Sequence, residues 1–166
     1  MIKKYNDFIL KSQRNRRIND IPFIAEFVEF SLNYMFAKKS PLYDFDLEIY
    51  LVDSINNNDN DLVDFNGLCQ DWDISNNRKL FNIKVLQTLS MGDIIDTLAH
   101  ELGHLYQTAM GHLIVEEDGW IWKKQFMGID PYKTEEDYFN LPWEADADNL
   151  QRKMCKKFFA ERYKNW

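Results

Sequence analysis

The chain has 166 residues, of which 45% are hydrophobic and 28% are charged, and its formal net charge at pH 7 is -7. Chains of this length and composition are typical of one globular domain with its own hydrophobic core. The sequence has no run of about 18 consecutive apolar residues and no apolar segment near its start, so we expect neither a membrane span nor a secretory signal. The two cysteines, Cys69 and Cys155, exclude a disulfide framework and favour a reducing, cytoplasmic compartment.

Basic residues are concentrated at the two ends of an acidic chain. We expect residues 1–20 to form a basic arm or helix in front of a domain that spans residues 21–166. The acidic total argues against nucleic-acid binding as the main activity. The C-terminal basic cluster is interpreted as the solvated face of a helix, with a nucleic-acid contact as the alternative. The two clusters comprise Lys11, Arg14, Arg16 and Arg17 at the start, and Arg152, Lys153, Lys156, Lys157, Arg162 and Lys164 at the end.

The first half of the chain predicts one helix and three strands. Aromatic residues recur at three-to-four spacing over residues 21–39, which predicts an amphipathic helix. Residues 45–52 begin in alternation and end in an apolar run, as a strand does. After a polar loop at residues 56–61, residues 67–74 and 79–87 predict two antiparallel strands joined by a turn, with one face in water.

The second half predicts two long helices on either side of a hairpin. Residues 91–110 carry an apolar stripe, and Ser90 with Asp93 three residues later forms a pair like a capping box. Residues 112–127 predict a second hairpin, and the stretch up to residue 141 is expected to be loop. A final helix is expected over residues 143–163, directly after Pro142.

The motif that carries the chemistry is His100-Glu101-Leu102-Gly103-His104. Two histidines at positions i and i+4 lie one turn apart on the same face of a helix, so both imidazoles can reach one metal ion. Glu101 is offset around the helix, close enough to hold a water beside the metal without ligating the metal. This is the pattern of zinc hydrolases, which take two ligands and a general base from one helical turn.

Two histidines need a third protein ligand to make a catalytic zinc site. The remaining histidine, His112, does not have the spacing of the metzincin pattern and is interpreted as a turn or strand residue. Glu144 is a better candidate because it falls in the first turn of the expected final helix. Asp148, one turn further on, shares its face and is placed to accept a hydrogen bond from a zinc-bound histidine. Acidic residues in a first helical turn are also favoured by the helix dipole alone.

The order His100-Glu101-x-x-His104 followed by Glu144-x-x-x-Asp148 resembles the gluzincin branch of the zincin metallopeptidases. The resemblance covers roughly residues 45–150. It implies one Zn²⁺ ion bound by His100, His104 and Glu144, with Glu101 as general base and Asp148 orienting His100. It also implies an α+β, zincin-like single domain, in which a small, mostly antiparallel sheet packs on the motif helix and on a C-terminal ligand helix.

The element order is similar to that of the compact single-domain gluzincins and of the intracellular peptidase domain that cleaves phage and stress-response repressors. The hairpin with Trp120 and Trp122, followed by Tyr138 and by Pro142-Trp143-Glu144, looks closest to short phage-encoded metallopeptidases of unassigned role. These resemblances imply hydrolysis of a protein or peptide substrate, in the host-cell cytoplasm or the virion if the chain is phage-encoded. Tyr138, Tyr132 and His112 are candidates for oxyanion or substrate contacts, and the strand at residues 80–87 is expected to line the cleft as an edge strand.

Three other interpretations stay open. The metal could be structural, tying the two long helices together. The chain could be a catalytically inactive, virion-associated protein on a zincin scaffold. A peptidase could also act on DNA-bound proteins, with the basic arm as a tether. A structural zinc site has no need of Glu101, so this residue favours the enzyme; the oligomeric state is left open by the sequence.

Overall fold

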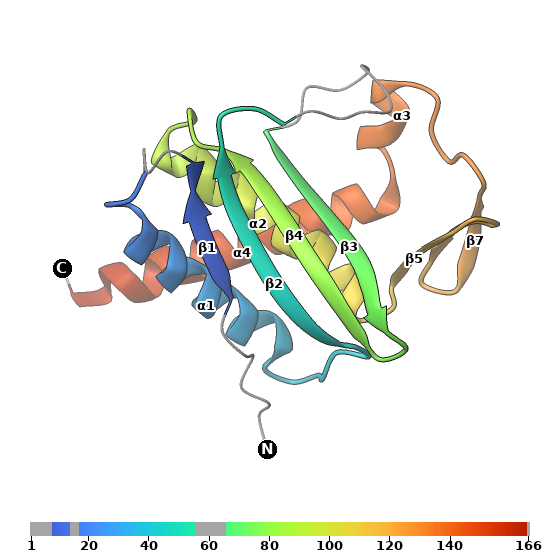
Figure 1. The fold of residues 1–166 in the computed structure, drawn as a ribbon, viewed down its shortest axis with the longest axis horizontal. Coiled ribbons are helices and arrows are strands. Elements are labelled where there is room, and N and C mark those ends of the chain that lie inside the picture. Colours follow the sequence, from blue (N-terminus) through green and yellow to red (C-terminus); the bar gives the residue numbers. More distant parts are fainter. Residues whose placement is uncertain (1–7, 14–16, 56–65, 166) are drawn as a thin grey trace.

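The computed structural model describes residues 8–13, 17–55 and 66–165 of the chain (Figure 1). Over these residues the chain forms seven strands and four α-helices, followed by a short 3₁₀ turn. In chain order the elements are β1 (Ile9–Ser12), α1 (Ile21–Phe36), β2 (Asp44–Val52), β3 (Gly67–Ser75), β4 (Arg78–Leu86), α2 (Met91–Ala109), β5 (Leu113–Glu116), β6 (Gly119–Trp122), β7 (Gln125–Gly128), α3 (Glu135–Phe139) and α4 (Pro142–Arg162).

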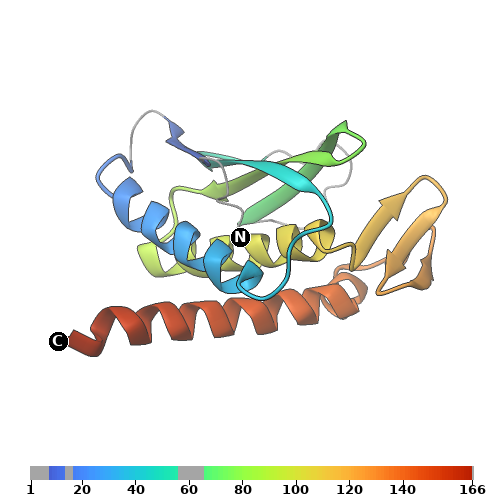
Figure 2. The same cartoon turned by 90° about the horizontal axis from the view of Figure 1, so that it is seen from below.

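The elements are stacked in three layers, which Figure 2 shows edge-on. The main sheet lies over α1 and α2, and α4 lies beneath these two helices, on the side away from the sheet. The expected α+β class is therefore present, but the final helix packs on other helices rather than on the sheet. This arrangement sandwiches α2, which carries the histidine motif, between the sheet and α4.

The main sheet has the strand order β1-β2-β4-β3. β1 pairs with β2 and β2 pairs with β4 in parallel, and β3 alone runs antiparallel, against β4. The expectation of a mostly antiparallel sheet is wrong here. The reasons are that α1 carries the chain back between β1 and β2, and that β2 pairs with β4 rather than with β3, so β1, β2 and β4 all run in the same direction.

Along β2 and β4, buried apolar residues alternate with partly exposed residues, and the buried ones lie on the face of the sheet that the helices cover. The inward residues are fully or almost fully buried, and the residues between them are partly exposed on the other face. The strands predicted at residues 45–52, 67–74 and 79–87 are confirmed to within one residue at each end. The buried positions in these two strands are Leu47, Ile49 and Leu51 in β2, and Phe81, Ile83 and Val85 in β4.

The helix α2 begins at the predicted residue and ends one residue before the predicted end. The Ser90 hydroxyl accepts a hydrogen bond from the Asp93 backbone N–H, and Gly111 adopts a left-handed conformation (φ 65°) just past the helix. Gly103 of α2 faces Ala147 of α4 so closely that a β-carbon on Gly103 would lie 3.1 Å from the Ala147 Cα. This contact sets the spacing between the two helices that carry the candidate ligands.

Two segments differ from the sequence prediction. Ile9–Ser12, expected in an arm or helix, form β1, while residues 1–7 and 14–16 of that segment lie outside the described residues, as does the loop expected at 56–61. Within the segment expected to be loop before residue 141, Glu135–Phe139 form α3, closed by a capping box between Thr134 and Asp137. The expected hairpin at 112–127 is present as β5 and β6, and β7 extends it to three strands.

Two of the basic residues at the ends of the chain, Arg17 and Arg162, pair with groups of the protein itself. Arg17 donates hydrogen bonds to the backbone carbonyls of Gln87 and Leu89 and pairs with Asp20. Arg162 near the end of α4 pairs with Glu26 of α1. Arg14 and Arg16 lie outside the described residues. Among the described residues, no helix is both long and apolar enough to cross a bilayer.

Candidate metal centre

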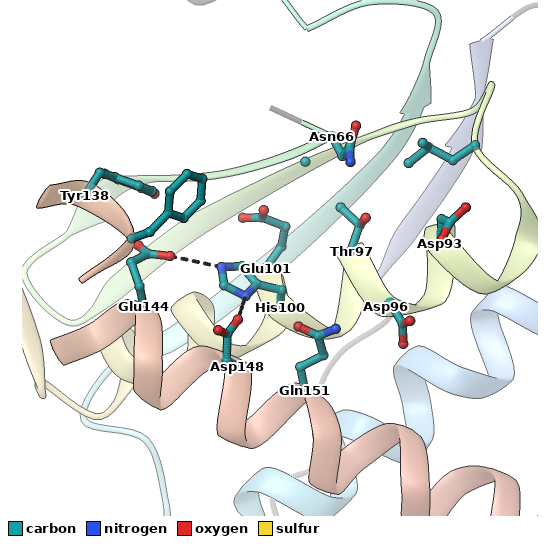
Figure 3. A pocket seen from close by; sticks show the side chains of 13 residues that line it. Asn66, Asp93, Asp96, Thr97, His100, Glu101, Tyr138, Glu144, Asp148 and Gln151 are labelled. Atoms are coloured by element: carbon teal, nitrogen blue, oxygen red, sulfur yellow. Dashed lines mark hydrogen bonds and ion pairs between the residues drawn. The ribbon is translucent and has the colours of Figure 1, made fainter. Parts of the chain in front are cut away.

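Three candidate ligand atoms from two helices converge between α2 and α4. The His100 Nε2 lies 3.0 Å from the His104 Nε2, and the Glu144 Oε2 lies 3.1 Å from the first and 3.4 Å from the second. The histidines come from one face of α2, and Glu144 comes from the first turn of α4, as the sequence predicts. Figure 3 shows the Glu144 and His100 side chains pointing toward each other.

The spacing of these atoms fits a small tetrahedral cation. Ligand atoms that are about 2.0–2.1 Å from a tetrahedral zinc ion stand about 3.3–3.4 Å from one another. The three observed separations, 3.0, 3.1 and 3.4 Å, lie close to that value. Two imidazole nitrogens and one carboxylate oxygen are also the donor types that Zn²⁺ takes in catalytic sites. Within the described part of the chain, His100, His104 and Glu144 are the only group with this capacity.

The charges at this centre favour a cation. Burial disfavours the protonated form of His104, but the hydrogen bond and the charge of Glu144 outweigh burial and raise the pKa of His104 to about 9. Burial also acts against the Glu144 carboxylate, yet its contacts with the two histidines lower its pKa to about 2. Burial and the charge of His104 act against the protonated form of His100, but the Glu144 hydrogen bond together with the charges of Glu101 and Glu144 raises its pKa. The three pKa shifts have a common origin: the Glu144 carboxylate is ionised, and it stabilises positive charge at the two histidines beside it.

Each histidine has a partner on its other ring nitrogen. The His100 Nδ1 lies 3.0 Å from the Asp148 Oδ1, so Asp148 is where the gluzincin resemblance places the partner of the first histidine (Figure 3). The His104 Nδ1 lies 3.1 Å from the Gln107 Oε1. Gln107 was not singled out from the sequence. The sequence feature that could have indicated this role is a polar residue one helical turn after His104, on the face of the helix that is otherwise apolar.

Glu101 lies beside the centre but is held by other groups. Its side chain is almost wholly buried, and its carboxylate accepts a hydrogen bond from the Cys69 backbone N–H of β3. Burial raises the pKa of Glu101, although the neighbouring histidines act in the opposite direction. A β-carbon on Gly67 would lie 2.8 Å from the Glu101 Oε1, so the carboxylate occupies space that only glycine leaves free.

A cleft of about 660 Å³ opens onto the centre, lined by the start of β3 and by α2, α3 and α4 (Figure 3). His100, Glu101 and Glu144 all lie on its wall. Tyr138 of α3 also lines the cleft, and its hydroxyl hydrogen-bonds with Glu144. Burial and the nearby carboxylates raise the pKa of Tyr138, so its hydroxyl stays protonated at neutral pH. The centre is therefore open to a ligand from one side.

The structure does not bring every candidate residue to the cleft. His112 lies between α2 and β5, where its ring contacts those of Tyr106 and Trp122 at centroid distances of 5.8 and 6.5 Å. The Tyr132 ring packs against Tyr138 at 5.2 Å. Neither His112 nor Tyr132 is part of the cleft lining.

The edge strand of the cleft is β3 rather than the strand expected from the sequence. The strand at residues 80–87 is β4, which lies inside the sheet between β2 and β3. Gly67, the first residue of β3, lines the cleft. In this hairpin β3 pairs with the outer side of β4, so β3 itself takes the edge position.

Comparison with known proteins finds no matching family model, no matching curated protein and no matching solved structure. These comparisons neither support nor contradict the resemblance to gluzincins. The assignment of the centre rests on its own donor atoms, their spacing and the cleft beside them.

Proposed function

We propose that the protein is a zinc-dependent peptidase of the gluzincin type. One Zn²⁺ ion would be held by His100, His104 and Glu144, with Glu101 as general base and a protein or peptide as substrate. The observation that carries this proposal is the convergence of the three donor atoms beside a buried carboxylate, on the wall of an open cleft. A structural zinc site is closed by four protein ligands, whereas this cleft leaves room for water and substrate.

The chain's own residues support hydrolysis as follows. Zinc, when bound, supplies Lewis acidity that polarises a carbonyl and acidifies water. Glu101 takes the proton of the attacking water and then gives it to the leaving amine. Its position on the wall of the cleft, beside the two histidines, places it to make both transfers.

Tyr138 is a candidate donor to the substrate's carbonyl oxygen as negative charge develops there. Its hydroxyl lies against Glu144, on the wall of the same cleft, and remains protonated at neutral pH. A neutral hydroxyl can donate a hydrogen bond to an oxyanion, and one such donor typically contributes 10²–10³ in rate. We include Tyr138 in the proposed site and leave out Tyr132 and His112, which do not line the cleft.

The edge of β3 is the proposed binding place for an extended substrate. An edge strand presents unpaired backbone groups, and a peptide can add to it as a further strand. β3 begins at the cleft beside Glu101 and runs along the edge of the main sheet (Figure 1). A peptide paired with β3 would therefore pass the metal centre.

The test combines metal content with turnover. The protein, purified without chelator, should contain about one zinc per chain by elemental mass spectrometry and should cleave members of a mixed peptide library. Glu101→Gln should keep the zinc and abolish cleavage, because the amide cannot take a proton. Wild-type cleavage rates in Glu101→Gln would overturn the mechanism. A folded wild type without zinc would overturn the metal centre, and zinc binding without cleavage would favour the structural or inactive alternative.

A further inference from the structure

Gln107 is a fully buried polar side chain that links a candidate ligand to the opposite helix. Its Oε1 lies 3.1 Å from the His104 Nδ1, and its Nε2 lies 2.8 Å from the Trp143 backbone oxygen and 3.1 Å from the Asp146 Oδ2. Buried polar groups are costly unless their hydrogen bonds are made. In this case the amide oxygen and both amide hydrogens have partners.

The partners of Gln107 fix the direction in which its amide points. The Trp143 carbonyl and the Asp146 carboxylate only accept hydrogen bonds, so the amide NH₂ group faces them. The amide oxygen is then left to face His104, and because this oxygen can only accept, the His104 Nδ1 carries a proton. When a metal ion displaces the proton from Nε2, the imidazole is neutral, with its remaining proton on Nδ1 and a free lone pair on Nε2. That lone pair is at the nitrogen that lies near His100 and Glu144.

We propose that Gln107 is a positioning residue that holds His104 in the tautomer and ring orientation needed to bind the metal through Nε2. Trp143 and Asp146 in turn hold Gln107. The proposal rests on the metal centre proposed above and adds to it a residue that the gluzincin motif does not contain. It also explains why a glutamine occupies a fully buried position on a helix that otherwise buries mainly apolar residues on that side.

The two histidines are held by different kinds of acceptor, and burial accounts for the difference. Asp148, the partner of His100, has a side chain that is 53% exposed, so its charge is solvated. Gln107 is 0% exposed, and a carboxylate there would carry a large desolvation cost. A neutral amide supplies the same acceptor without a buried charge.

The series of polar contacts from His104 through Gln107 and Asp146 ends at the surface, at Lys123 in the turn between β6 and β7. The Lys123 Nζ lies 3.3 Å from the Asp146 Oδ1, and Lys123 and Lys124 adopt positive φ angles of 47° and 74°. Lys123 is exposed, so its pairing with Asp146 is screened by solvent. The effect on the metal should therefore decrease along the series Gln107, Asp146 and Lys123.

The experiment measures zinc affinity by competition with a chromogenic chelator at one fixed pH. Removal of a partner that orients a metal ligand typically costs 10–100-fold in metal affinity. We expect Gln107→Met, which keeps the length of the side chain but cannot accept the His104 proton, to bind zinc at least about tenfold more weakly. Asp146→Ala should show a smaller loss in the same direction. Gln125→Met, an exposed glutamine in β7, is the matched control and should bind zinc like the wild type.

A second measurement determines the tautomer of His104 in the wild-type protein, so it does not depend on a variant that folds. Nitrogen-15 NMR of the zinc-loaded wild type should show His104 protonated at Nδ1 and bound through Nε2. Zinc bound through Nδ1 would overturn the proposal, even if Gln107→Met fails to fold. Wild-type zinc affinity in both Gln107→Met and Asp146→Ala would also overturn it while leaving the metal centre intact. A wild type that binds no zinc would overturn the metal centre itself.

Discussion

Gly67 at the start of β3 lies directly against Glu101 of α2. A β-carbon added to Gly67 would be 2.5 Å from the Thr97 Cγ2 and 2.8 Å from the Glu101 Oε1. Such distances are too short for van der Waals contact, so either the Glu101 carboxylate or the strand has to move. The position of the proposed general base therefore depends on a missing side chain on the neighbouring strand.

Gly67→Ala is expected to reduce peptide cleavage and to leave zinc bound. A displaced base lowers the rate because proton transfer depends on geometry, and a shift of about 1 Å can cost about 10²-fold. The measurements are kcat on a cleaved peptide and zinc per chain. Gly92→Ala, on the helix α2 that carries Glu101, is the control, because a β-carbon there would meet only the Ser90 Oγ, at 3.8 Å. Equal kcat in the two variants would contradict a role for this packing.

The helix α2 and its motif could be predicted because their signals are local. The N-cap residue Ser90, the apolar stripe and the two histidines four residues apart all lie within one segment of the sequence. A helix is made of hydrogen bonds between residues four apart, so signals at this spacing are enough to predict it. Glu144 and Asp148 were predicted for the same reason, since they share a face at the start of α4. The structure adds the contact between the two helices, which brings Glu144 to the histidines.

The parts that were not predicted depend on distant partners or on very short segments. β1 has four residues and is a strand through its parallel pairing with β2, a contact about 40 residues away in sequence. The edge position of β3 follows from the strand order, which local patterns do not encode. α3 is different, because its start has a local signal: Thr134 and Asp137, three residues apart in the sequence, form a capping box.

Helix spacing at Gly103 is expected to control metal affinity. A β-carbon there would lie 3.1 Å from the Ala147 Cα and 3.2 Å from the Ala147 Cβ, so Gly103→Ala should push α4 away from α2. We expect weaker zinc binding, because Glu144 moves with α4, and a loss of about 1–3 kcal/mol in unfolding free energy from overpacking. Chelator competition and denaturant unfolding measure the two effects. Gly92→Ala again serves as the control, and zinc affinity unchanged from the wild type would show that α4 adapts without moving its ligand.

Removal of the metal is expected to destabilise the wild type through the three proposed ligands. A ligand that binds only the folded state at about 100 times its Kd stabilises that state by about 2.7 kcal/mol. A strong chelator should therefore lower the melting temperature of the wild type. Glu144→Ala should show a much smaller chelator effect, because the third ligand is lost. A chelator effect of wild-type size in Glu144→Ala would mean that the third ligand was assigned to the wrong residue.

Cys155 is expected to react slowly with alkylating reagents in the folded protein. Burial, followed by the hydrogen bond and charge of Asp96, raises the pKa of the Cys155 thiol from 9.0 to about 12. Because the thiolate is the reactive form, a shift of this size lowers the thiolate fraction at pH 8 by about a thousandfold. Alkylation should remain slow until the pH is well above 9, as followed by mass spectrometry of the Cys155 peptide.

The same thiol gives a test of the Asp96 contact, in which the Cys155 Sγ lies 3.4 Å from the Asp96 Oδ1. Asp96→Asn removes the negative charge that opposes the thiolate, so the pKa of Cys155 should fall and its alkylation at pH 8 should become faster. Asp93→Asn, one turn earlier on α2, is the control, because Asp93 pairs with Ser90 rather than with the thiol. Equal acceleration by both variants would point to general loosening of α2 instead of the Asp96 charge. No acceleration by Asp96→Asn would leave burial as the sole cause of the slow reaction.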